Sequence, residues 1–272
     1  MFKRLHRIWL RHVLRRSHIP YELWHEVVTS SPVLSQLNHN EQHRLRKLSC
    51  CFLHKKIIST VGDLEFDLRK RVVIASQACL LILNLDLSYF RGWHEIIVYP
   101  GSFIIDRNEI DSSGVVHRTR HALSGEAWLR GPVILSWSDA QPGTHTHSQA
   151  SNVIIHEFAH KLDMLNGAAN GMPPLHSDMI REKWTESLSH AYDKLYHQIE
   201  RHHHTSVDAY AVESPAEFFA VLSEVFFERP ALLHKLYPQV YHQLSLFYRQ
   251  NPLQRQANGT QKHHTSQVQR EK

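Results

Sequence analysis

The segment from Val153 to Asp163 contains the pattern His-Glu-x-x-His inside an apolar run, and this pattern constrains the fold more than any other feature. An apolar run of this length predicts a helix, and a four-residue spacing places His156 and His160 on the same helical face. Two imidazoles one turn apart can bind one zinc ion at about 2.0–2.1 Å each. Glu157 follows the first histidine, so it is placed to act as general base for a water molecule at the metal.

A simpler interpretation is that these are two surface histidines on an amphipathic helix, since the chain contains 24 histidines. The flanking residues argue against this interpretation, because they predict a largely buried helix. They are Val153, Ile154, Ile155, Phe158 and Leu162. Buried histidines need polar partners, and a metal ion supplies one. We therefore interpret the motif as a metal site.

A catalytic zinc site needs a third protein ligand and keeps one position open. Metzincins use a histidine six residues after the second one, but that position is Asn166 here, so the third ligand is expected to be a glutamate on a later helix. The candidates are Glu182, Glu186, Glu200, Glu213, Glu217 and Glu224. We favour Glu217, because it lies in an otherwise apolar helix where a carboxylate needs a cation or hydrogen-bond donors. Glu182 and Glu186 lie on a regular polar helix face and are expected to be solvated.

Two further acidic residues have two interpretations each. Asp163 lies three residues after His160 and could orient a ligand imidazole, or it could simply be a polar residue at the helix end. Glu224 lies two turns beyond Glu217 on nearly the same face. It could likewise hold a ligand histidine or be an exposed side chain.

The order of secondary structure predicts an α+β fold. Before residue 90 the apolar spacing predicts helices, one following Pro20, one beginning at Asn40-Glu41, and one within 66–85. Short β-rich runs are predicted at 95–99, 103–105, 115–119 and 132–137, and we expect the last, Pro132–Trp137, to be the sheet-edge strand that lines the cleft. The final third predicts helices over 153–165, 181–200 and 215–228, with Ser214 as the N-cap of the last.

The composition excludes several classes of protein. No apolar run reaches the roughly 18 residues of a membrane span, and the chain has no transmembrane segment by this criterion.

The net charge of +5 reflects a basic N-terminus, which is interpreted as a solvated helix or, alternatively, a membrane-surface helix. Without a nucleic-acid-binding motif, we expect no direct nucleic-acid partner. Three cysteines, two of them adjacent, form a poor disulfide framework and favour a reducing compartment.

Three segments together resemble the Mlc titration factor A family of bacterial cytosolic zinc peptidases, whose catalytic core is related to that of anthrax lethal factor. The segments are His156–Gly167, Ser124–Trp137 and Tyr210–Glu224. The resemblance covers roughly residues 10 to 250 and does not extend to the polar tail.

This resemblance implies a zincin-like metallopeptidase core with a small mixed sheet, preceded by a helical portion. We expect the helical portion at 1–90, the catalytic core at 91–250 and a disordered polar tail at 251–272. The resemblance implies one Zn²⁺ per chain, held by His156, His160 and Glu217, with Glu157 as general base. It also implies a tyrosine seven residues before the glutamate ligand, here Tyr210, whose hydroxyl can stabilise an oxyanion.

The expected function is cytoplasmic hydrolysis of peptide substrates, aminopeptidase-like in character. The resemblance further implies binding and titration of the Mlc-type transcriptional repressor of glucose phosphotransferase genes. The alternative is a non-catalytic protein that sequesters the repressor, with a structural or regulatory zinc site. An intact Glu157 favours the enzyme, since a structural site needs no base.

Overall fold

The computed structural model describes residues 13–14, 17–110, 116–123, 125–127, 131–141 and 152–256. For 103–110, 116–123 and 126 the description covers the backbone alone. Nearly all of the basic N-terminal stretch therefore lies outside the described residues. Among the described residues, no helix combines the length and the apolar character that crossing a membrane requires.

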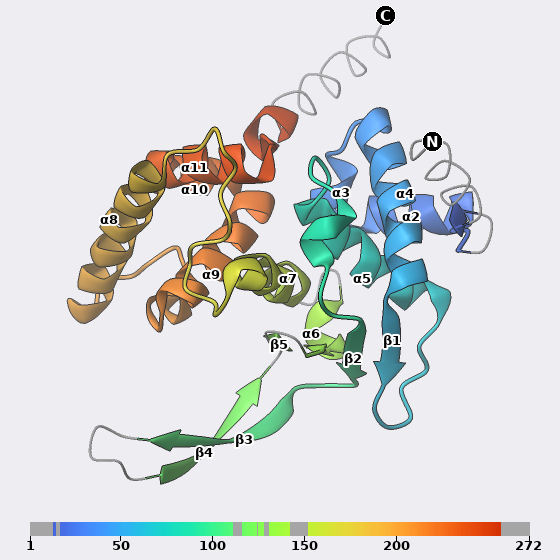
Figure 1. The fold of residues 1–272 in the computed structure, drawn as a ribbon, viewed down its shortest axis with the longest axis horizontal. Helices are drawn as coiled ribbons and strands as arrows, with labels where there is room; N and C mark the ends of the chain where they lie inside the picture. Colours follow the sequence, from blue (N-terminus) through green and yellow to red (C-terminus); the bar gives the residue numbers. More distant parts are fainter. Residues whose placement is uncertain are drawn as a thin grey trace, which may run out of the picture.

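Helices dominate both ends of the chain, and the strands lie between them (Figure 1). The helices before the sheet region are α2 (Tyr21–Ser30), α3 (Pro32–Ser35), α4 (His39–Lys55), α5 (Leu68–Leu81) and the 3-10 helix η1 (Leu87–Phe90). Those after it are α6 (Trp137–Ala140), α7 (Val153–Asp163), η2 (Met164–Asn166), α8 (Arg181–Glu200), η3 (Ala209–Val212), α9 (Pro215–Glu228), α10 (Pro230–Leu236) and α11 (Pro238–Tyr248). The α+β prediction is confirmed, and α8 and α9 have the predicted bounds.

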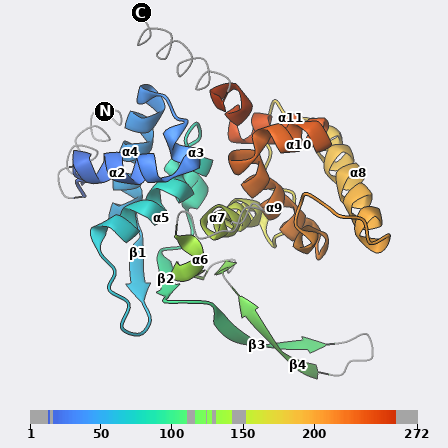
Figure 2. The ribbon, with the colours of Figure 1, turned by 180° about the vertical axis from the view of Figure 1, so that it is seen from behind.

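The strands form two sheets. They are β1 (Ile57–Thr60), β2 (Glu95–Tyr99), β3 (Phe103–Ile110), β4 (Val116–Leu123), β5 (Gly125–Ala127) and β6 (Val133–Ser136). One sheet has the order β1-β2-β6-β5, in which β1, β2 and β6 are parallel and β5 runs antiparallel to β6. The other is the β3–β4 hairpin, which projects from the body in both ribbon views (Figures 1 and 2).

The expectation that Pro132–Trp137 forms the sheet edge is wrong. The strand β6 lies between β2 and β5, and Trp137 already belongs to α6. All four residues of β6 are buried, as expected for a strand that is paired on both sides and covered on both faces. The edge next to α7 is formed instead by β5, which is three residues long.

Helix α7 lies at the centre of the molecule, between the N-terminal helices and the C-terminal helices (Figures 1 and 2). It packs against α5, α9, β5 and β6, which is why ten of its eleven residues are buried. Its aromatic residue Phe158 meets Phe52, Phe90 and Trp93 at ring-centroid distances of 5.2–5.7 Å. The motif-bearing helix is therefore fixed on several sides by apolar packing.

Polar contacts join the C-terminal end of the described chain to α4 and α5. The guanidinium of Arg255 donates to the carboxylate of Glu41 at 2.7 and 2.9 Å, and Gln250 donates to the carbonyl of Leu80 at 2.7 Å. Residues 252–256, at the start of the segment expected to be a polar tail, are helical. Its remainder, from residue 257, lies outside the described residues.

Candidate metal centre

The N-terminus of α7 is held by Asn152, which connects three helices. Its side-chain oxygen accepts from the backbone N–H of Ile155 at 3.0 Å, as an N-cap does. Its side-chain nitrogen donates to Gln77 of α5 at 2.6 Å and to Glu228 of α9 at 3.0 Å. The backbone N–H of Asn152 donates to Glu224 at 2.5 Å. The position of α7 is therefore set by hydrogen bonds as well as by packing.

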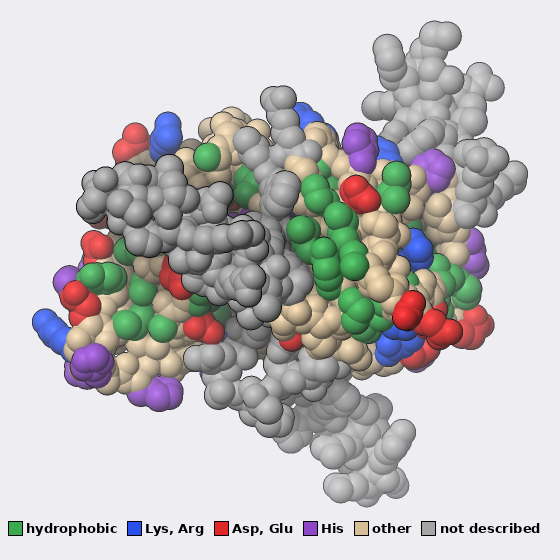
Figure 3. Space-filling view, turned by 90° about the horizontal axis from the view of Figure 1, so that it is seen from below, with side chains coloured by type: hydrophobic (Ala, Val, Ile, Leu, Met, Phe, Trp, Pro, Cys, Tyr) green, Lys and Arg blue, Asp and Glu red, His purple; other side chains and the backbone are tan. Residues whose placement is uncertain are grey.

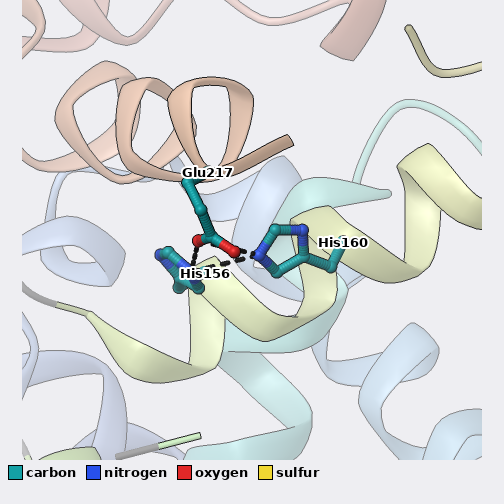
Figure 4. A group of neighbouring side chains, drawn as sticks. All are labelled: His156, His160 and Glu217. Atoms are coloured by element: carbon teal, nitrogen blue, oxygen red, sulfur yellow. Dashed lines mark hydrogen bonds and ion pairs between the residues drawn. The ribbon is translucent and has the colours of Figure 1, made fainter. Parts of the chain in front are cut away.

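Three side chains converge on one another, two from α7 and one from α9 (Figure 4). His156 and His160 extend from α7, and Glu217 reaches them from the first turn of α9. The Nε2 atoms of the two histidines are 3.2 Å apart. The Oε2 atom of Glu217 lies 3.0 Å from Nε2 of His156 and 3.2 Å from Nε2 of His160.

These three donor atoms fit a zinc ion. Ligands bound at about 2.0 Å to a tetrahedral ion are separated from one another by about 3.3 Å. The observed separations of 3.0–3.2 Å match that triangle. Two imidazoles and one carboxylate are also the donor set of many catalytic zinc sites. Among the described residues this is the one group of histidine, cysteine and acidic side chains close enough to hold a metal ion.

Glu224 holds His156 from behind. Its Oε1 atom lies 2.7 Å from Nδ1 of His156, a position in which the carboxylate accepts from Nδ1–H. A carboxylate in this position fixes the tautomer that binds a metal. Burial disfavours the charged imidazole, but Glu217 and Glu224 together raise the pKa of His156 well above its usual value. Of the two roles considered for Glu224, the geometry matches the one that orients a histidine.

Glu217 is directed to the histidines by its place on α9. Ser214 is the N-cap of this helix, and its hydroxyl accepts from the backbone N–H of Glu217 at 3.1 Å. The pattern Ser-x-x-Glu often forms a capping box, in which the glutamate bonds back to the cap residue. Here the carboxylate contacts the imidazoles instead. Burial opposes ionisation, but His156 and His160 hold the pKa of Glu217 far below its usual range.

Glu157 follows His156 in α7, its charge acts on that histidine, and its side chain is 4% exposed. Its side chain is covered by Gly125 of β5: a Cβ atom added there would lie 2.6 Å from Cγ and 2.7 Å from Cδ of Glu157. Such distances are not compatible with normal van der Waals contact. The strand β5 can therefore approach the carboxylate only because position 125 is a glycine.

Tyr210 lies in η3, just before α9, and its ring centroid is 6.1 Å from that of His156. The residue is 39% exposed, so its ring lies at the open side of the centre. The structure thus brings Tyr210 close to the predicted ligands. Glu182, Glu186, Glu200 and Glu213 are exposed and do not belong to the cluster.

Asp163 connects the end of α7 to the segment before α8. Its Oδ2 atom accepts from the backbone N–H groups of Asn170 and Gly171 at 2.8 and 2.7 Å. Gly171 has φ +76°, and a Cβ atom there would collide with the carbonyl oxygen of Pro215 at the start of α9. Asp163 therefore helps to set the spacing of the two helices that carry the candidate ligands. This positioning role adds to the two considered from the sequence.

Three residues contribute to the site but were not predicted from the sequence, namely Asn152, Gln77 and Gly125. An asparagine directly before an apolar helix is a recognisable N-cap signal, so Asn152 could have been found. Gln77 gave no signal, since it is a single polar residue in an apolar segment. Gly125 lies within one of the quoted segments, but its role depends on a contact with Glu157 that only the folded chain makes.

The sequence profile of the glucose-regulated metallo-peptidase M90 family matches residues 5–249, which is most of the chain. This chain belongs to the M90 metallopeptidase family. The resemblance noted from the three segments is thereby confirmed.

Relatives of this M90 member carry the name Mlc titration factor A. The protein from Klebsiella pneumoniae subsp. pneumoniae is 38% identical over 242 residues, covering 87% of this chain and 89% of the relative. The protein from Shigella dysenteriae serotype 1 is 37% identical over 252 residues, covering 91% and 93%. The protein from Yersinia pestis is 37% identical over 235 residues, covering 85% and 86%. The similarity therefore extends along nearly the whole length of both partners.

Proposed function

We propose that this M90 member is a zinc-dependent peptidase of aminopeptidase-like character. The observation that carries the proposal is the triangle of donor atoms from His156, His160 and Glu217, with Glu157 adjacent to it. Zinc bound there supplies a Lewis acid that polarises a peptide carbonyl and makes a water molecule easier to deprotonate. The donor set and its spacing support zinc in preference to magnesium or calcium, which favour oxygen ligands.

The remaining chemistry belongs to side chains of the chain itself. Glu157 takes a proton from the attacking water and passes it to the leaving amine. Glu224 keeps the proton of His156 on Nδ1. Tyr210, at the open side, donates a hydrogen bond to the oxyanion that develops on the carbonyl oxygen. The packing of Glu157 under β5 keeps its carboxylate in one orientation, which general-base catalysis requires.

The first test measures zinc content and peptide hydrolysis in parallel. Glu217→Ala removes one of three protein ligands and should lower zinc stoichiometry sharply, with loss of hydrolysis. Glu157→Gln should retain zinc and lose nearly all hydrolysis, because only the base is removed. Glu186→Ala, an exposed glutamate on α8, serves as the matched control and should change neither. Full zinc occupancy in Glu217→Ala would contradict the ligand assignment.

We also propose that the protein binds and titrates an Mlc-type transcriptional repressor. The proposal is supported by the name that the relatives carry and by their similarity along most of the chain. A cytoplasmic location is part of this proposal and agrees with Cys50, Cys51 and Cys79, which are buried free thiols. The alternative function is repressor sequestration without catalysis, in which the zinc site is structural or regulatory.

A titration of Glu157→Gln against the purified repressor separates these functions. Repressor binding is expected to use a surface of the protein and not its proton transfer, so the variant should bind normally while it fails to hydrolyse peptides. Wild-type protein with full zinc is the reference for both measurements. Loss of both activities in a folded, zinc-loaded variant would mean that the repressor occupies the catalytic cleft itself.

A further inference from the structure

A cavity lies between α4 and the segment from Asp86 to His94. Its volume is about 980 Å³, which is at the upper end of the range for small-molecule sites. None of the candidate metal ligands lines it, nor do Glu157 or Tyr210. Its lining is therefore separate from the candidate metal centre.

The lining of the cavity is strongly basic. Five cationic side chains line it against the single carboxylate of Asp86, namely those of Arg44, Lys47, Lys55, Lys56 and Arg91. In the whole chain the ratio is nearly even, with 31 Lys and Arg against 26 Asp and Glu. On the face seen in Figure 3, Lys and Arg side chains are dispersed among acidic ones. The cavity is therefore an unusual concentration of positive charge.

The one carboxylate, that of Asp86, offsets only one of these charges. Asp86 accepts from the backbone N–H of Ser88 at 2.6 Å and caps η1. Lys47 and Arg91 are both exposed, and within the described part of the chain neither side chain has a hydrogen bond or ion pair. Two cations at the cavity are therefore available to a ligand.

Lys56 lies at the inner side of the cavity. Its ammonium donates to the carbonyls of Phe90 and Trp93, each at 2.6 Å, and lies 3.4 Å from the centre of the Trp93 ring. Burial lowers the pKa of Lys56 to about 7, and the neighbouring charges that lower it further belong to Lys161 and Lys55. Lys56 therefore carries only part of a positive charge near neutral pH, and the firm positive charge of the cavity belongs to its exposed cations.

The rest of the lining is apolar. It is formed by Leu48, Cys51, Leu87, Phe90 and Trp93. An apolar lining with a few convergent charged groups is typical of sites for small organic ligands. The four exposed cations of the lining, Arg44, Lys47, Lys55 and Arg91, outnumber its one carboxylate and favour a negative charge on that ligand.

We propose that this cavity binds a small amphipathic anion, with an aliphatic or aromatic body and one carboxylate or phosphate group. The body lies against Leu87, Phe90 and Trp93. The charged group lies toward Lys47 and Arg91. This binding is independent of the metal centre, so it stands or falls separately from the proposed peptidase activity.

The probe for the test is 1-anilinonaphthalene-8-sulfonate, an aromatic anion whose fluorescence rises in apolar sites. Wild-type protein should bind one probe molecule per chain, with and without a chelator. Octyl phosphate, used as a monomer, should displace the probe. Octyltrimethylammonium has the same alkyl body with the opposite charge and should not displace it at equal concentration.

Two double variants with the same net charge locate the site. Lys47→Gln with Arg91→Gln should weaken binding of the probe and of octyl phosphate by about five- to ten-fold. Arg181→Gln with Lys235→Gln removes two exposed cations far from the cavity, and should change affinity by less than about two-fold. Both pairs replace exposed residues, and circular dichroism verifies their folding. Equal displacement by the two octyl compounds, or equal weakening by the two double variants, would overturn the proposal.

Discussion

Glu217 shows how one residue can have two locally reasonable roles. Its position three residues after Ser214 suits a capping box, in which it would stabilise its own helix. In the folded chain the hydroxyl of Ser214 caps the helix alone, and the carboxylate of Glu217 extends to two histidines. The cluster of His156, His160 and Glu217 thus uses a carboxylate that could otherwise cap its own helix.

The hydroxyl of Tyr210 can be tested by a single substitution. Tyr210→Phe removes one hydroxyl and keeps the ring that lies next to His156. If the hydroxyl donates to the oxyanion, turnover should fall by roughly 10²–10³, the range for a lost oxyanion donor. The Michaelis constant and zinc content should change little. The measurement is steady-state kinetics with a peptide substrate, beside Tyr196→Phe, another exposed tyrosine, as control. Unchanged turnover would make Tyr210 a packing residue.

The short strand β5 directly contacts the candidate general base. This three-residue strand is the sheet edge next to α7, and its glycine lies against the carboxylate of Glu157. The position of the β5 backbone and the orientation of the Glu157 side chain therefore depend on each other. A side chain larger than hydrogen at position 125 must displace one or the other.

Gly125→Ala should lower peptide hydrolysis by about 10²-fold or more, because a displacement of about 1 Å in a catalytic group has an effect of that size. Zinc content should persist, since no ligand contacts Gly125. Gly101→Ala is the control: its Cβ atom would meet only the hydroxyl of Ser138 at 3.8 Å, an ordinary contact. Normal activity in Gly125→Ala would show that Glu157 can move without consequence.

The helices could be predicted from the sequence more fully than the order of the strands. The helices 181–200 and 215–228 were predicted with their observed bounds, because apolar spacing and cap residues are local signals. The roles of His156, Glu157 and His160 could be predicted for the same reason, since their motif is a local sequence pattern. The order of the strands was not, because β6 became an internal strand through pairing with β5, and a segment of glycine, glutamate and alanine has no strand signal.

For the molecule as a whole, Glu228 couples stability to pH. Burial raises the pKa of Glu228 from 4.5 to about 7, and the nearby charge of Glu224 adds to the effect. The folded state therefore keeps a proton on Glu228 that the unfolded chain releases above about pH 4.5. Because the folded state binds more protons in this window, its stability from this group falls as pH rises from about 4.5 to 7.

Glu228→Gln should remove this dependence. Gln keeps the acceptor for Asn152, whose nitrogen lies 3.0 Å from Oε1 of Glu228, but it does not ionise. Between pH 5 and pH 7.5, the free energy of unfolding of the wild type should fall relative to the variant by about 1–3 kcal/mol. Urea unfolding at both pH values measures the difference. An equal change in both proteins would show that Glu228 does not titrate in this window.

The position of the candidate ligands along the chain has a further consequence. Glu217 lies 61 residues from His156 and 57 from His160, and on a different helix. Any ion held by both helices closes a loop of that length, as a covalent bridge would. Closing a loop of about 60 residues restricts the unfolded chain by an amount worth about 4 kcal/mol. The three cysteines are free thiols and provide no such bridge. The metal would therefore be this chain's reversible cross-link, one that reducing conditions do not break.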